Sequence, residues 1–216
     1  MSTNKIKAFI FDFGNVLSLA PPADLMKGMA DYLDAEEEAF SNAYYKWRNH
    51  YDDGTYSQHQ YWEAVAETLG SQISQSHSQA LFDLDYNMWF REPNRDTCAW
   101  VSYLRDHGYR VALLSNMPGD HQRHLDIHCD WFPTFHHRTF SGPLKCAKPN
   151  PEIYHHTLDG LGVKADETVF IDDNADNIAA ARALGLHSIH FKNAQQAAAE
   201  IKTAHSIDLP LQNFEE

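Results

Sequence analysis

Short, nearly continuous apolar runs recur along the chain, and polar side chains directly follow three of them. The runs cover residues 8–11, 110–114 and 168–171. They are followed by Asp12, by Ser115-Asn116 and by Asp172-Asp173. Apolar runs without alternation are typical of strands buried on both faces of a parallel sheet. The pattern therefore predicts strands whose carboxyl ends carry acidic, hydroxyl and amide groups.

Helical periods alternate with these strands in the second half of the chain. Asn94 and Asn150 are positioned to cap helices, and the helix after Asn150 has Pro151 at its first position and Gly162 just past its end. Weaker strands are expected over 134–140 and 187–191. Alternation of this kind predicts an α/β fold with a doubly wound, Rossmann-like parallel sheet and right-handed crossovers.

The segment between the first two strands contains only helical periods. Its clearest apolar face is a set at helical spacing: Phe40, Ala43, Tyr44, Trp47 and Tyr51. Asp52-Asp53-Gly54 breaks that helix, and Ser57 with Gln60 forms a capping box for the next one. We predict a core domain of residues 1–18 and 94–216, with an inserted helical cap domain of residues 19–93.

Charge and composition exclude several classes of function. The chain has 216 residues and a formal net charge of -13, which argues against binding to nucleic acid or to an anionic membrane. No apolar stretch approaches the ~18 residues of a membrane span, and the polar N-terminus does not resemble a signal peptide. Three cysteines without metal-ligand spacing are typical of reduced thiols. We expect a cytoplasmic protein.

The polar groups after the three strands are expected to meet at one edge of the sheet, where open α/β sheets bind ligands. Three carboxylates in one crevice repel one another, and a hard cation such as Mg²⁺ relieves that repulsion. A carboxylate beside such a metal can attack phosphorus, while a lysine and a hydroxyl can hold phosphoryl oxygens. Lys148 precedes a predicted helix N-terminus, and the alternation of strands and helices predicts that its loop lies at the same edge; Lys145 is the alternative lysine.

Four motifs in this order resemble the haloacid dehalogenase-like hydrolase superfamily, over nearly the whole chain. They begin at Asp12-Phe13-Gly14-Asn15-Val16, Leu114-Ser115-Asn116, Lys148-Pro149-Asn150-Pro151 and Phe170-Ile171-Asp172-Asp173. The helical insertion is similar to the cap of the subfamily that includes sugar-phosphate phosphatases of the glucose-1-phosphate type. The resemblance implies a Mg²⁺-dependent phosphatase that acts on a small phosphorylated metabolite, with a sugar phosphate as the expected substrate.

The resemblance also implies a role for each matching residue. Asp12 would be the nucleophile that forms an aspartyl-phosphate, and Lys148 would pair with both Asp12 and the phosphate. Ser115 and Asn116 would hold the phosphoryl group. The ligands of Mg²⁺ would be Asp12, the backbone carbonyl of Gly14, Asp172 and Asp173.

One position departs from the family pattern. Phosphatases of this superfamily usually carry a second Asp, as general acid and base, where this chain has Gly14. General acid–base help is worth typically 10²–10⁴-fold, so either a cap residue or the substrate supplies the proton, or turnover is low. Residues at the Asp53-Gly54 break could close over the site, and we expect Tyr51, Asp53 and Tyr56 to contact substrate.

The residues are also compatible with two other functions. A metal-independent haloacid dehalogenase would attack carbon with Asp12, although such enzymes carry small uncharged residues where this chain has Asp172 and Asp173. A degenerate member would bind phosphorylated metabolites with little turnover. Either a monomer or a homodimer is compatible with the sequence. His121, His124 and His128 could share a helical face, which we expect to be a wet surface stripe.

Overall fold

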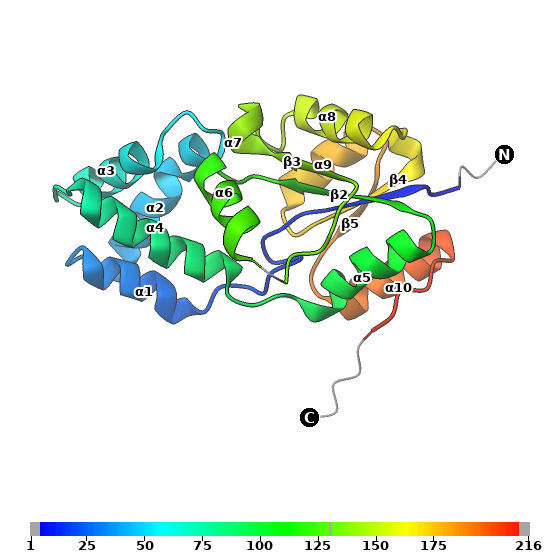
Figure 1. Cartoon of the computed structure of the whole chain (residues 1–216), viewed down its shortest axis with the longest axis horizontal. Helices are drawn as coiled ribbons and strands as arrows, with labels where there is room; N and C mark the ends of the chain where they lie inside the picture. The colour runs from blue at the N-terminus through cyan, green and yellow to red at the C-terminus, as the bar shows by residue number, and fades with distance from the viewer. Residues whose placement is uncertain (1–4, 130, 212–216) are drawn as a thin grey trace.

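The computed structural model describes residues 5–129 and 131–211, which form a sheet domain and a helical unit beside it (Figure 1). In these residues five strands make one parallel sheet in the order β3-β2-β1-β4-β5. The strands are β1 (Ala8–Phe11), β2 (Arg110–Ser115), β3 (His137–Phe140), β4 (Thr168–Asp172) and β5 (His187–His190). The doubly wound parallel sheet predicted from the sequence is confirmed.

Helices cover both faces of this sheet because successive strand side chains point to opposite sides. Phe9 and Phe11 pack with α5 (Arg95–Asp106) and α10 (Ala194–His205). Ala8 and Ile10 pack with α8 (Pro151–Leu161) and α9 (Ala175–Ala183) on the other face. The helices that cover the central strands present apolar side chains on both faces, which explains why these strand sequences show no polar alternation.

The helical unit consists of α1 (Ala23–Tyr32), α2 (Glu37–Asp52), α3 (Gln58–Thr68) and α4 (Gln75–Phe90). It has a core of its own, built from Met29, Phe40, Tyr44, Trp62, Val65 and Leu81 among others. The capping box of Ser57 and Gln60 is present at the start of α3. The chain enters and leaves this unit side by side, because Ser18 and Pro93 form an antiparallel bridge.

Two short helices complete the edge of the sheet nearest the helical unit. One is α6 (Gly119–His128), after β2, and the other is α7 (Ser141–Leu144), after β3. The sequence predicted only a loop from 141 to 149, and the expected strand over 134–140 begins at His137. No helix within the described ranges is long and apolar enough to cross a membrane.

Candidate active site

The register of the central strands brings the predicted acidic groups together. Phe11 in β1 pairs with Ile171 in β4, and the Asp12 N–H donates to the Ile171 carbonyl at 2.9 Å. The residues that follow, Asp12 and Asp172, therefore emerge next to each other. Asn15 has a positive φ of 57°, which turns the chain back so that its side chain returns to the site.

Lys148 connects the two acidic strand ends. Its Nζ donates to Asp12 Oδ1 at 2.7 Å and to Asp172 Oδ2 at 2.6 Å, and also to the Leu114 carbonyl at 3.0 Å. The lysine side chain is buried, so this ion pair is shielded from water. Lys145, the alternative lysine, instead donates to the carbonyl of Gly54.

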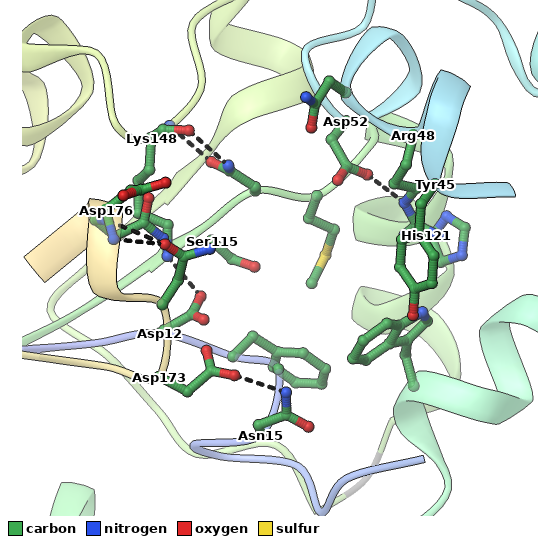
Figure 2. Close-up of a pocket in the computed structure, with 18 of the residues that line it drawn as sticks. Asp12, Asn15, Tyr45, Arg48, Asp52, Ser115, His121, Lys148, Asp173 and Asp176 are labelled. Carbon is green, nitrogen blue, oxygen red and sulfur yellow. Dashed lines mark hydrogen bonds and ion pairs between the residues drawn. The ribbon is translucent and has the colours of Figure 1, made fainter. Parts of the chain in front are cut away.

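Asn116 orients the Lys148 loop. Its Oδ1 accepts from the Lys148 N–H at 2.8 Å, and its Nδ2 donates to the Lys148 carbonyl at 2.9 Å (Figure 2). Its side-chain amide is thus engaged with the backbone, although Asn116 and Ser115 both line the cavity.

The two adjacent acids Asp172 and Asp173 have different environments. Asp172 is fully buried, and its carboxylate accepts from Lys148, from Asn177 Nδ2 at 3.1 Å and from the Asn174 N–H at 2.8 Å. Asp173 lines the cavity, where its Oδ2 accepts from Asn15 Nδ2 at 2.7 Å (Figure 2). Asp172 therefore anchors Lys148, and Asp173 presents the more accessible oxygen.

Burial dominates the protonation of the nucleophile candidate. Burial raises the pKa of Asp12, the charge of Lys148 lowers it, and the charges of Asp172 and Asp173 raise it again, to a final value of about 7. Burial lowers the pKa of Lys148, but the charges of Asp12 and Asp172 hold it above its ordinary value. One lysine thus faces three carboxylates, and the site has an excess of negative charge.

The donor set fits a hard divalent cation. Oxygens of Asp12, Asp172 and Asp173 all lie within 4.8 Å of one another. Oδ1 of Asn15 is buried and has no hydrogen-bond partner among residues 5–129 and 131–211. Mg²⁺ prefers a few carboxylate oxygens completed by water and phosphate oxygens. A cation would also balance the excess negative charge. Gly14 lines the same cavity.

A cavity of about 650 Å³ separates these residues from the helical unit. The wall opposite the strand ends comes mainly from one face of α2, at the spacing i, i+3, i+4 and i+7: Tyr45, Arg48, Asn49 and Asp52. Figure 2 shows Arg48 and Asp52 across the cavity from Asp12 and Asp173. The sequence reasoning missed this face, although a polar stripe at helical spacing with a central arginine was the available signal.

The residues at the helix break that we expect from the sequence to contact substrate do not line the cavity. Tyr51 is buried, stacks on Tyr61 and places its hydroxyl 3.5 Å from His121 Nδ1. Asp53 accepts from the N–H of Thr55, and Tyr56 packs on Trp47. None of the three is among the residues that line the cavity. The reason is that the apolar face of α2, which includes Tyr51, packs into the core of the helical unit and not against the cavity.

His121 also differs from expectation. It is 1% exposed, because α4 covers α6, and its Nε2 lies 3.1 Å from Asp85 Oδ2. The prediction of a wet histidine stripe is wrong for this residue. A second helix, distant in sequence, supplies the cover, and no periodicity within α6 could reveal it.

Comparisons with known proteins agree with this geometry. A model of the haloacid dehalogenase-like hydrolase family matches residues 6–185. A sesquiterpene phosphatase of Aspergillus oryzae is 26% identical over 91% of this chain and 95% of its own length. An (S)-2-haloacid dehalogenase of Burkholderia cepacia is 26% identical over 86% of this chain and 83% of its own. These relatives include enzymes of both reaction types considered above.

A solved structure shares the fold. It is a wild-type enzyme of the same family from Bacteroides thetaiotaomicron, in complex with magnesium and inorganic phosphate. It matches with a TM-score of 0.66 at 23% identity and covers 87% of this chain and 95% of its own.

Proposed function

The chain belongs to the haloacid dehalogenase-like hydrolase family, and on this premise we propose that it is a Mg²⁺-dependent phosphomonoester hydrolase. The observation that carries the proposal is the position of Lys148 Nζ between Asp12 and Asp172, beside the cavity-facing Asp173. This arrangement provides a nucleophile, a cation for phosphoryl oxygens and an acidic metal site in one crevice.

In the proposed reaction, an Asp12 carboxylate oxygen attacks the phosphorus of the substrate. The O–P bond to Asp12 forms as the bond to the leaving oxygen breaks, and water then hydrolyses the aspartyl-phosphate to release inorganic phosphate. In this proposal Lys148 orients Asp12 and offsets phosphoryl charge, and the hydroxyl of Ser115, which lines the cavity, donates to a phosphoryl oxygen. Mg²⁺, when bound by Asp12, Asp173, the Gly14 carbonyl and Asp172 directly or through water, supplies electrostatic stabilisation of the phosphoryl group.

The proton for the leaving oxygen does not come from residue 14, since Gly14 has no side chain. In the proposal, water or a group of the substrate or cap donates it. Esters of acidic alcohols need this help least. We therefore expect phosphate release to be faster from aryl phosphates than from alkyl phosphates of similar size.

We assign the helical unit, residues 19–93, as the cap that selects the substrate. A sugar phosphate is our first candidate, because Tyr45, Asn49 and Asp52 offer polar groups to hydroxyls across the cavity. The aromatic lining of Phe13, Trp89 and Phe90 supports a second candidate, a phosphate ester of an apolar alcohol, as the name of the Aspergillus oryzae relative suggests. We further propose that the enzyme is cytoplasmic and is either a monomer or a homodimer.

The dehalogenase alternative is weaker. Attack on carbon needs no metal, whereas the cluster of Asp12, Asp172 and Asp173 concentrates negative charge that a cation would balance. A phosphate-binding protein without turnover is also less favoured, because pure binding does not require a carboxylate at the position of Asp12.

The test is phosphate release from sugar phosphates, prenyl phosphates and 4-nitrophenyl phosphate, with Mg²⁺ and with EDTA. We expect Mg²⁺-dependent release that Asp12→Asn abolishes, and the relative rates rank the two substrate classes. Halide release from 2-haloacids in EDTA would instead establish the dehalogenase. Substrate binding detected by calorimetry without release of phosphate would favour the binding protein.

A further inference from the structure

The cap wall of the cavity contains an arginine whose charge is already balanced. Arg48 donates from Nε to Asp52 Oδ1 at 2.7 Å and from Nη1 to Asp85 Oδ2 at 3.0 Å. Its Nη1 also donates to the hydroxyl of Tyr44, which in turn donates to Asp85 Oδ1 at 2.6 Å. Arg48 and Asp52 side chains are each 14% exposed, and Asp85 is 0% exposed.

The combined charge of Arg48, Asp52 and Asp85 does not favour the binding of an anion. One guanidinium faces two carboxylates, and His121 on the core side adds positive charge only when it is protonated. Burial would raise the pKa of Asp85, but Arg48, His121 and Tyr44 lower it to about 2, so it is ionised at neutral pH. Burial raises the pKa of Asp52. With His121 neutral, the group has a net charge of -1 when Asp52 is ionised and zero when it is protonated.

We propose that Asp52 is a specificity-determining residue that keeps Arg48 unavailable to substrate, so that the site selects phosphomonoesters whose organic part is uncharged. This inference rests on the proposed function and defines its substrate class. It favours hydroxylated or apolar alcohols, and it excludes bisphosphates and phosphorylated carboxylic acids as preferred substrates.

The geometry explains the direction of the preference. Arg48 and Asp52 lie across the cavity from Asp12, so the organic part of an ester whose phosphoryl group is at Asp12 would face them (Figure 2). A carboxylate there would meet the charge of Asp52 and would have to displace it from the guanidinium. Like charges brought together in a site oppose binding, and a charge-assisted pair is difficult to replace. A hydroxyl or amide meets neither penalty and can bond with Asn49 or Tyr45.

The experiment compares two esters of the same shape, 4-carbamoylphenyl phosphate and 4-carboxyphenyl phosphate. For the unmodified protein we expect kcat/KM to favour the uncharged amide by about tenfold or more. Asp52→Asn frees the guanidinium from one carboxylate and should shift this ratio toward the carboxylate by about tenfold. Asp53→Asn is the matched control. It also removes one carboxylate, but Asp53, the residue next to Asp52, does not line the cavity.

A double variant, Asp52→Asn with Arg48→Met, tests whether the shift depends on the arginine. We expect the double variant to lose the gain for the carboxylate ester. The inference is overturned if the unmodified protein handles both esters equally or prefers the carboxylate, or if Asp52→Asn and Asp53→Asn change the ratio equally. Equal handling of the two esters by the unmodified protein overturns the inference even if a variant does not fold.

Binding separates this inference from the proposed function. The phosphonates that correspond to the two esters are not hydrolysed, and calorimetry in Mg²⁺ measures their affinity directly. If no ester releases phosphate, the proposed hydrolase fails, while a preference for the uncharged phosphonate still supports the role of Asp52. Equal affinities for the two phosphonates, with phosphate release intact, would reject the specificity role alone.

Discussion

Trp89 of α4 lies against Gly14 in the turn that follows Asp12. A Cβ added at Gly14 would lie 3.3 Å from Cζ3 and 3.6 Å from Cε3 of the indole. The indole is held in place, because its Nε1 donates to the Tyr44 hydroxyl at 3.1 Å. An aromatic side chain of the helical unit therefore crowds the position at which the resemblance to phosphatases leads us to expect an acid. The size of the side chain at position 14 is therefore limited by the position of Trp89.

Gly14→Asp should consequently fail to supply a general acid and should destabilise the protein. Overpacking of this kind costs typically 1–3 kcal/mol, and we expect the loss to shrink when Trp89→Ala makes room. Urea unfolding of both single variants and the double variant gives the coupling free energy, expected to be about 1 kcal/mol. Additive losses in this cycle would show that the indole and residue 14 do not compete for space.

Mg²⁺ should stabilise the protein through the acidic cluster. A ligand that binds only the folded state adds RT ln(1 + [L]/Kd), roughly 2.7 kcal/mol at one hundred times Kd, and raises the melting temperature. We expect Asp173→Asn to remove most of this rise, because Asp173 presents the accessible carboxylate. Asp176→Asn is the control, since Asp176 lines the same cavity but lies outside the cluster. Equal responses of the two variants would place the ion elsewhere.

The buried group around Arg48 should make stability depend on pH in the acid range. Burial raises the pKa of Asp85, yet Arg48, His121 and Tyr44 lower it to about 2, which is below its value in an unfolded chain. A lowered pKa in the folded state gives stability that is present above pH ~4 and lost as the pH falls toward 2. The shift corresponds to about 2 kcal/mol.

Urea unfolding between pH 6 and pH 2 measures this contribution. Asp85→Asn should be less stable at pH 6 and should lose about 2 kcal/mol less than the unmodified protein on acidification. Asp83 lies in the same helix but is exposed, and Asp83→Asn is therefore the matched control. The same acid loss in all three proteins would contradict the assignment.

Gly54 should be a contact point between the helical unit and the sheet domain. Its φ is +70°, and an added Cβ would lie 2.6 Å from the Gly142 carbonyl oxygen. Gly70 has a similar φ of +76°, but apart from its own chain neighbours no described residue has an atom within 4 Å of an added Cβ. Both Gly→Ala substitutions incur the backbone penalty of about 1 kcal/mol, and Gly54→Ala should cost at least ~1 kcal/mol more. Equal losses in urea unfolding would show that the two domains separate freely at this point.

Local patterns in the sequence determined the strands, the helix boundaries and the edge of the sheet at which the site lies. The apolar runs predicted buried parallel strands, and the carboxyl ends of such strands meet at one edge whatever their separation along the chain. Asp12, Asp172 and Lys148 could therefore be expected at one site from their positions alone. Helix boundaries at Ser57 and Asn150 followed from side-chain caps, which act over three residues or fewer.

Only the tertiary structure decided how the helical unit meets that edge. It placed the polar face of α2 that carries Arg48 and Asp52 against the cavity and left Tyr51, on the apolar face, in the core of the helical unit. It also buried His121 beneath α4 and placed Trp89 on Gly14. These contacts join residues far apart in the sequence, and their energies depend on how the helical unit packs against the sheet domain, which no local pattern contains.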